Sequence, residues 1–144
     1  MMMIIIEQLT LEHTRTMAIQ AAQLTVGPLV KDDAYIASLI AAGPAYAVVV
    51  DGSTIAIAGV SIFWKGRGFG WATLSALAAP HMRELTREVR NFLKFSSISR
   101  IETAVDCRFK QGHQWARMLG LQKEGTMRAW GPQGDDFDLY ARIK

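Results

Sequence analysis

Hydrophobic and polar positions repeat along this chain with two periods, and each period predicts a different element. Alternation at every second residue predicts a strand, whereas apolar positions three and four apart predict a helix. Ile101, Thr103 and Val105, for example, share one face of a predicted strand. Strands are predicted over 3–9, 46–50, 54–64, 69–77, 100–105, 123–130 and 137–143. Helices are predicted from Thr10 to a break at Gly27-Pro28, and over 31–42, 80–96 and 110–119.

Turn and cap residues mark several of these boundaries. Asp51-Gly52 predicts a tight turn, Pro80 suits the first position of a helix, and Gly120 ends one. The strands over 46–77 are almost continuously apolar, which predicts that both faces of their sheet are covered. The second helix is predicted to bury three side chains, with Ile36 as a further candidate. The three are Ala34, Tyr35 and Leu39.

The predicted order is β-α-α-β-β-β-α-β-α-β-β, which predicts an α/β fold. A chain of 144 residues without repeats or linkers predicts one domain over 1–144. No apolar run reaches the roughly 18 residues of a membrane span, and the start lacks the pattern of a signal peptide. We therefore expect a cytoplasmic protein with no membrane partner.

Charge and cysteine content narrow the classes of function further. The net charge is +3, and most of the cations lie from Lys65 onward. They form either a solvated surface or a basic face for a nucleotide cofactor or nucleic acid. Acids such as Glu84 and Glu88 interrupt them, which disfavours nucleic acid. Cys107 is the single cysteine and is predicted to be a buried or half-buried structural thiol. The three histidines lack metal-ligand spacing, so no metal site is predicted.

The end of the chain carries a more specific pattern. A predicted helix closes on Trp115-Ala-Arg-Met-Leu-Gly-Leu121, and Lys123-Glu-Gly125 and a hairpin follow. This segment resembles the end of GNAT-superfamily acetyltransferases, and the predicted order of elements is that family's order throughout. The resemblance implies the acyl-CoA N-acyltransferase fold, an α/β fold with a mixed central sheet flanked by helices. It also implies acetyl-CoA as the cofactor and transfer of its acetyl group to an unknown amine.

The resemblance also locates a cofactor site, at the junction between the predicted fourth strand and the following helix. Members of the family place a loop of the form Arg/Gln-x-x-Gly-x-Gly/Ala there, whereas residues 74–84 of this chain contain no glycine. A helix N-terminus still favours anions, and nearby cations can replace lost amide donors. The predicted cofactor-binding residues are Ser75, Leu77, His81, Arg83 and Arg87.

The catalytic groups of the family are largely absent from the matching positions. Ala116 stands where the family often has a tyrosine as general acid. Asp106, at the end of the strand before that helix, is the predicted general base, with an uninvolved surface carboxylate as the alternative. Whether the chain is an enzyme is therefore left open by its sequence.

A narrower resemblance supports a second reading. Gly112-His-Gln-Trp-Ala-Arg-Met-Leu-Gly120 is similar to a helix of GNAT-like proteins encoded by tailed bacteriophages, including internal virion components. It implies a non-catalytic pseudoenzyme that binds other virion proteins, in the host cytoplasm or the virion. Its predicted contact surface is the hairpin that carries Trp64, Phe69 and Trp71.

Overall fold

The structure of the protein is a computed structural model, which describes residues 3–15, 17 and 31–144. The chain divides into two compact units, Met1–Ile62 with Gly70–Met82 and Phe63–Phe69 with Arg83–Lys144. Each unit is described by itself. No helix in the described part of the chain is long and apolar enough to cross a membrane.

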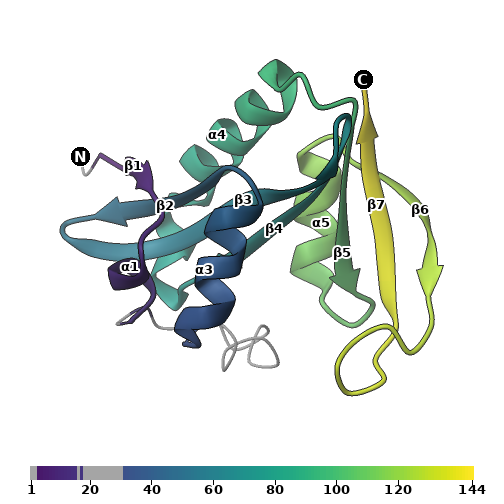
Figure 1. The fold of residues 1–144 in the computed structure, drawn as a ribbon, viewed down its shortest axis with the longest axis horizontal. Coiled ribbons are helices and arrows are strands. Elements are labelled where there is room, and N and C mark those ends of the chain that lie inside the picture. Colours follow the sequence, from purple (N-terminus) through teal and green to yellow (C-terminus); the bar gives the residue numbers. More distant parts are fainter. Residues whose placement is uncertain (1–2, 16, 18–30) are drawn as a thin grey trace. The chain divides into compact units, whose positions relative to one another are not determined.

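The observed elements follow the predicted order, with one 3-10 helix, η2, added before the third predicted helix (Figure 1). The strands are β1 (Ile5–Gln8), β2 (Ala45–Val50), β3 (Ser53–Trp64), β4 (Arg67–Leu74), β5 (Arg100–Asp106), β6 (Gln122–Met127) and β7 (Phe137–Ile143). The helices are α1 (Leu11–Arg15), α3 (Asp33–Ala42), η2 (Ala76–His81), α4 (Met82–Phe95) and α5 (Lys110–Met118).

Seven strands form one mixed sheet in the order β1-β2-β3-β4-β5-β7-β6. β4 and β5 are parallel, over Arg67–Phe69 and Arg100–Glu102. The pairs β1–β2, β2–β3, β5–β7 and β6–β7 are antiparallel. A mixed sheet is therefore confirmed.

The core of the first unit lies between the helices α1 and α3 and one face of the strands. Ile36 of α3 is fully buried and packs in one cluster with Ala47 of β2 and Ile57 of β3. On β3, three successive residues, Ile55, Ala56 and Ile57, are at most 2% exposed. Because successive side chains of a strand point to opposite faces, both faces of β3 are covered, as the sequence predicts.

The residues at turns and caps explain where β2 and α5 end. Asp51 and Gly52 both have positive φ, as a two-residue hairpin turn of type I′ requires. Gly120 also has positive φ, and the next residue, Leu121, donates its N–H to the carbonyl of Ala116. These are the features of a Schellman cap, so the predicted stop of α5 is confirmed.

Three sequence predictions differ from the structure. Ala34 and Tyr35 are exposed, because α3 turns Ile36 toward the core instead. Pro80 lies inside η2 and not at the first position of the long helix, which begins at Met82. β4 runs over Arg67–Leu74 and so starts and ends earlier than predicted. The predicted course of the first helix through Ala18 to its break at Gly27-Pro28 lies outside the described residues.

In the second unit, β5, β7 and β6 lie side by side and α5 runs along β5 (Figure 1). Trp115 of α5 donates its indole N–H to the hydroxyl of Thr86 of α4 at 2.8 Å, which ties the two helices together. The C-terminus of α4 is capped by β7, since Arg142 donates to the carbonyl of Leu93 at 2.7 Å. A cation at that end also suits the helix dipole.

Candidate functional site

The predicted cofactor-binding segment begins in the first unit at Ser75, the N-cap of η2. Its side chain is almost fully buried, and its hydroxyl accepts the N–H of Leu77 at 3.0 Å. The carbonyl of Ser75 accepts the N–H of Ala78 at 3.0 Å. Two of the amides that a helix start offers to an anion are therefore already bonded. Leu77 is exposed and His81 is half-buried.

Loss of the Ser75 hydroxyl leaves the Leu77 amide without this partner. We expect Ser75→Ala to lower the free energy of unfolding by about 1 kcal/mol, the usual cost of losing an N-cap. Urea denaturation followed by circular dichroism measures the change. Ser53→Ala is the matched control, because Ser53 is exposed at the start of β3. Equal effects of the two substitutions would contradict a capping role.

Arg83 and Arg87, in the second unit, are one turn apart and exposed on α4. Among the described residues neither forms an ion pair, whereas Arg67, Arg100 and Arg108 each bind a carboxylate. An unpaired guanidinium presents several donors in a planar fork that matches phosphate oxygens. These two side chains are thus the segment's available anion-binding groups.

Asp106, the predicted general base, ends β5 in the second unit. Its carboxylate accepts three bonds from Arg108: from the backbone N–H at 2.9 Å, from Nε at 3.2 Å and from Nη2 at 3.0 Å. The hydrogen bonds from Arg108 hold the pKa of Asp106 below its ordinary value. The carboxylate is therefore ionised near neutral pH, but it is a weaker proton acceptor than a free aspartate.

A histidine and a tyrosine lie beside Asp106 that the sequence did not single out as a pair. His113 of α5 contacts the Tyr140 hydroxyl of β7 through Nδ1 at 2.8 Å, and the Asp106 carbonyl through Nε2 at 3.1 Å. Since a carbonyl only accepts, Nε2 carries the proton, and in the neutral ring Nδ1 accepts from Tyr140. The pair joins α5 to the ends of β5 and β7.

A second polar group centres on Asp138 of β7, which is buried. Its carboxylate accepts from Thr126 Oγ1 at 2.6 Å and from Cys107 Sγ at 3.3 Å, and it pairs with Lys123 Nζ at 3.2 Å. The prediction of a buried or half-buried Cys107 is wrong, since the residue is exposed at the strand end. Desolvation and the Asp138 carboxylate raise the pKa of the Cys107 thiol, so it is less reactive as a nucleophile.

Asp138 gives the fold a defined acid sensitivity. The hydrogen bond from Thr126, with those from Cys107 and Lys123, holds the pKa of Asp138 below its ordinary value. Its stabilising effect is therefore complete above the unfolded pKa of about 3.9 and is lost as the pH falls through the lower folded pKa. We expect the difference in thermal midpoint between wild type and Asp138→Asn to be constant near neutral pH and to shrink below about pH 4. A pH-independent difference would contradict this assignment.

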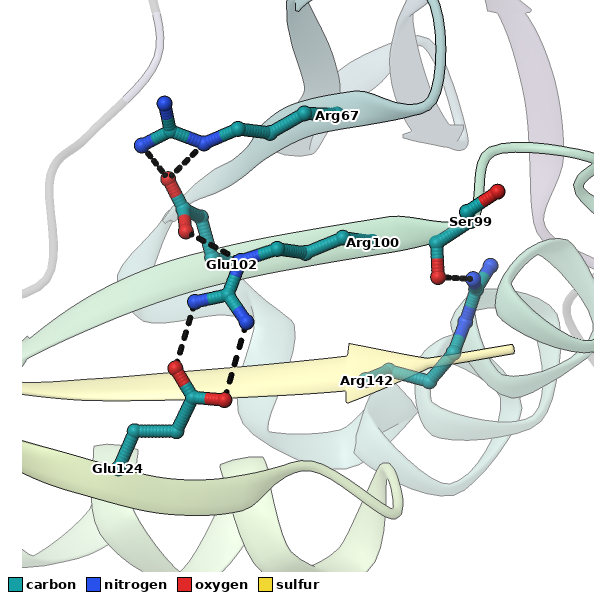
Figure 2. Close-up of polar contacts among 6 residues, drawn as sticks. All are labelled: Arg67, Ser99, Arg100, Glu102, Glu124 and Arg142. Carbon is teal, nitrogen blue, oxygen red and sulfur yellow. Dashed lines mark hydrogen bonds and ion pairs between the residues drawn. The ribbon is translucent and has the colours of Figure 1, made fainter.

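A ladder of alternating charges crosses β4, β5 and β6 in the second unit (Figure 2). Glu102 is buried and accepts from Arg67 Nε at 3.0 Å and Arg100 Nε at 2.8 Å. Arg100 extends the ladder to Glu124 through Nη1 at 3.0 Å and Nη2 at 2.5 Å. Burial alone would raise the pKa of Glu102, but the bonds from Arg67 and Arg100 outweigh it and lower the pKa.

The predicted site residues thus fall into three local settings. Ser75, Leu77 and His81 belong to the first unit, and Arg83 and Arg87 to the second. Asp106 lies in the second unit next to the polar cluster of His113, Tyr140, Cys107, Thr126, Lys123 and Asp138. Ala116 is buried in α5. Across the described ranges, no group of three or more His, Cys, Asp or Glu side chains could hold a metal ion.

Comparison with solved structures shows the fold to which these sites belong. The chain is similar to ribosomal-protein-S5-alanine acetyltransferase from Vibrio fischeri, with 14% identity, a TM-score of 0.70, and 97% of this chain and 92% of that chain covered. It is similar to IAA acetyltransferase from Bacillus cereus, with 13% identity and a TM-score of 0.71. The alignment covers 99% of this chain and 100% of that chain. It also resembles a putative phosphinothricin N-acetyltransferase, with 11% identity, a TM-score of 0.73, and 98% of each chain covered.

A scan against protein-family models and a search of curated proteins found no match to this sequence. The structural likeness, at identities of 11–14%, establishes the architecture alone. The chain has the mixed α/β fold of the GNAT acetyltransferases, as its sequence predicts. The single domain, the site residues and the narrower likeness to phage proteins stay predictions.

Proposed function

We propose that this protein is an acetyl-CoA-dependent N-acetyltransferase whose cofactor phosphates are held by arginine side chains. The observation that carries the proposal is that Arg83 and Arg87 of α4 are exposed and form no ion pair with any residue that the structure describes. Arg67 and Arg100, by contrast, are neutralised by Glu102. The GNAT fold supports this class of reaction by analogy with the acetyltransferases that share the fold.

The residues of the segment fit such a cofactor in a particular way. Because Ser75 engages the amides of Leu77 and Ala78, these backbone donors do not cradle a phosphate. Arg83 and Arg87, both in the second unit, would bind the pyrophosphate through their guanidinium groups.

The bound cofactor would supply an acetyl thioester. The acceptor nitrogen would bond to the acetyl carbon while the carbon–sulfur bond breaks, and the proton that the amine loses would pass to the departing sulfur. Asp106, held ionised by Arg108, would orient the amine by its charge more than by taking its proton. Positioning of the two reactants alone supplies a large part of the rate enhancement.

Reversal of the two charges tests the cofactor residues. We expect Arg83→Glu/Arg87→Glu to weaken acetyl-CoA binding by at least about tenfold, because two phosphate contacts become repulsive. Thermal shift against acetyl-CoA concentration measures the affinity. Arg90→Glu/Arg117→Glu makes the same change in net charge at two other exposed arginines and is the matched control. Equal weakening by both pairs would contradict a specific site.

The transfer itself is tested by release of free thiol from acetyl-CoA with polyamines, aromatic amines and peptide amino termini as acceptors. Amine-dependent thiol release, with acetylated product detected by mass spectrometry, is the expected result. A non-catalytic module, such as a phage virion or ejection component, is the second candidate. The engagement of the Leu77 and Ala78 amides by Ser75 favours it, and cofactor binding without any acceptor would support it.

A further inference from the structure

Four exposed apolar side chains gather at one end of the second unit. Phe63 is 51% exposed, Trp64 60%, Phe95 74% and Ile143 68%. They come from the β3–β4 hairpin, the end of α4 and the end of β7. We call them, with Lys65 and Lys94, the hairpin-end surface. Most large apolar side chains of a soluble domain are covered, so such a group indicates a contact surface.

Backbone hydrogen bonds fix these segments against one another. Arg100 at the start of β5 donates its N–H to the carbonyl of Gly66 in the hairpin turn at 2.9 Å. Lys144 donates its N–H to the carbonyl of Ser99 at 2.8 Å, and its Nζ to the carbonyls of Lys94 and Ser96 at 3.0 and 2.8 Å. These bonds hold the β3–β4 hairpin, the end of α4 and the end of β7 together at one end of the second unit.

The prediction that Trp64, Phe69 and Trp71 together form the contact surface of the hairpin is corrected by the structure. Trp64 is exposed, but Phe69 stacks on Trp130 with ring centroids 6.3 Å apart. Trp71 packs against the core cluster of the first unit. The exposed aromatic partner of Trp64 is Phe63, which lies next to it in the chain.

The chain segments that carry this surface contain Lys and Arg but no acidic residue. The sequence has no Asp or Glu between Asp51 and Glu84, between Glu88 and Glu102, or after Asp138. Glu102 of β5 and Glu124 of β6 are bound by arginines. Lys65 forms no ion pair among the described residues, and Lys94 Nζ lies 5.4 Å from the centroid of the Phe95 ring.

We propose that the hairpin-end surface binds an anionic lipid membrane, at the interface and without spanning it. Trp and Phe favour the boundary between headgroups and acyl chains, and lysines beside them attract anionic lipids. The apolar side chains project from a turn, a helix end and a strand end, and an aliphatic side chain is among them. This proposal revises the expectation of no membrane partner and does not depend on the proposed enzymatic function.

Other occupants fit the same residues less well. The Arg67 guanidinium lies 4.8 Å from both the Phe63 and Trp64 ring centroids, so a nucleic-acid base cannot enter between the rings. Arg67, Arg100 and Arg142 are occupied by carboxylates or carbonyls and are not available to a phosphate backbone. A second copy of the chain would bring Lys65 and Lys94 against the same cations of its partner.

Vesicle co-sedimentation of the full chain tests the proposal. We expect binding to phosphatidylcholine vesicles that contain phosphatidylglycerol, no binding to phosphatidylcholine alone, and weakening with added salt. Phe63→Ser/Trp64→Ser should lower the partition coefficient by more than about tenfold, because two large side chains no longer insert. Lys65→Glu/Lys94→Glu should abolish the preference for anionic vesicles.

Met118→Ser is the matched control, since Met118 is also exposed but lies on α5 outside this surface, and it should bind as wild type does. Unchanged thermal midpoints would show that each variant is folded. Absence of vesicle binding by wild type would overturn the proposal, as would equal binding by the Phe63→Ser/Trp64→Ser variant. Binding to oligothymidylate in place of vesicles would also overturn it and assign the surface to nucleic acid.

Discussion

Glu102→Gln is expected to lower the free energy of unfolding by about 3 kcal/mol. The Glu102 side chain is 5% exposed and neutralises two guanidinium groups, from Arg67 and Arg100. Removal of its charge leaves the Arg67 guanidinium without its carboxylate partner near a buried position, and leaves Arg100 with Glu124 alone. The two arginine side chains are themselves 34% and 27% exposed, which places the loss at the lower end of the usual range for a buried pair.

The measurement is the thermal midpoint, which should fall by about 6–12 °C for a chain of this size. Glu124→Gln is the matched control, because Glu124 lies at the more exposed end of the same ladder and binds Arg100 alone. Glu124→Gln should lower the free energy of unfolding much less than Glu102→Gln, since water can replace the lost contact. Equal losses for the two variants would contradict the central position that Figure 2 shows for Glu102.

Gly43→Ala is expected to destabilise the first unit by about 3 kcal/mol. A methyl group at Gly43 would collide with the carbonyl oxygen of Val60 and would lie 3.1 Å from Cγ1 of Ile62. The obstacle is backbone, so no side chain can rotate away. The close approach is fixed by the neighbouring bond from the Val60 N–H to the Pro44 carbonyl at 2.9 Å.

Denaturation by urea, followed by the fluorescence of Trp71 in the same unit, measures the loss. Gly125→Ala is the control, because nothing lies within 4 Å of a methyl group there and its φ is not positive. We expect a change within about 0.5 kcal/mol for it. A tolerated Gly43→Ala would contradict the tight packing of β3 on the end of α3.

The sequence predicted the strands and most of the helices because their periods are local properties. It was weaker on which face of an element is buried. On β7 the alternating apolar residues begin at Phe137 and end at Ile143, yet Ile143 is exposed and the polar Asp138 and Tyr140 are buried. The cause is α5, whose His113 bonds to Tyr140 on that face. A hydrophobic pattern does not contain this tertiary contact.

The candidate site was predictable to a similar extent. The position of Arg83 and Arg87 at the start of a helix followed from the pattern and from a resemblance. The partners of Asp138 did not, because Cys107, Thr126 and Lys123 come from separate parts of the chain and meet only in the fold. The spacing of residues in the sequence also could not show that Arg108 would form an ion pair with the carboxylate of Asp106.

Calorimetric titration of the purified protein with acetyl-CoA tests the central claim most directly. The proposed function predicts saturable binding in the micromolar range, within the range that enzymes show for their substrates. A ligand at about 100 times its dissociation constant should add roughly 2.7 kcal/mol of stability, so a thermal shift should accompany the heat. Neither heat nor shift at millimolar acetyl-CoA would contradict the claim and would leave this chain a GNAT fold without the GNAT cofactor.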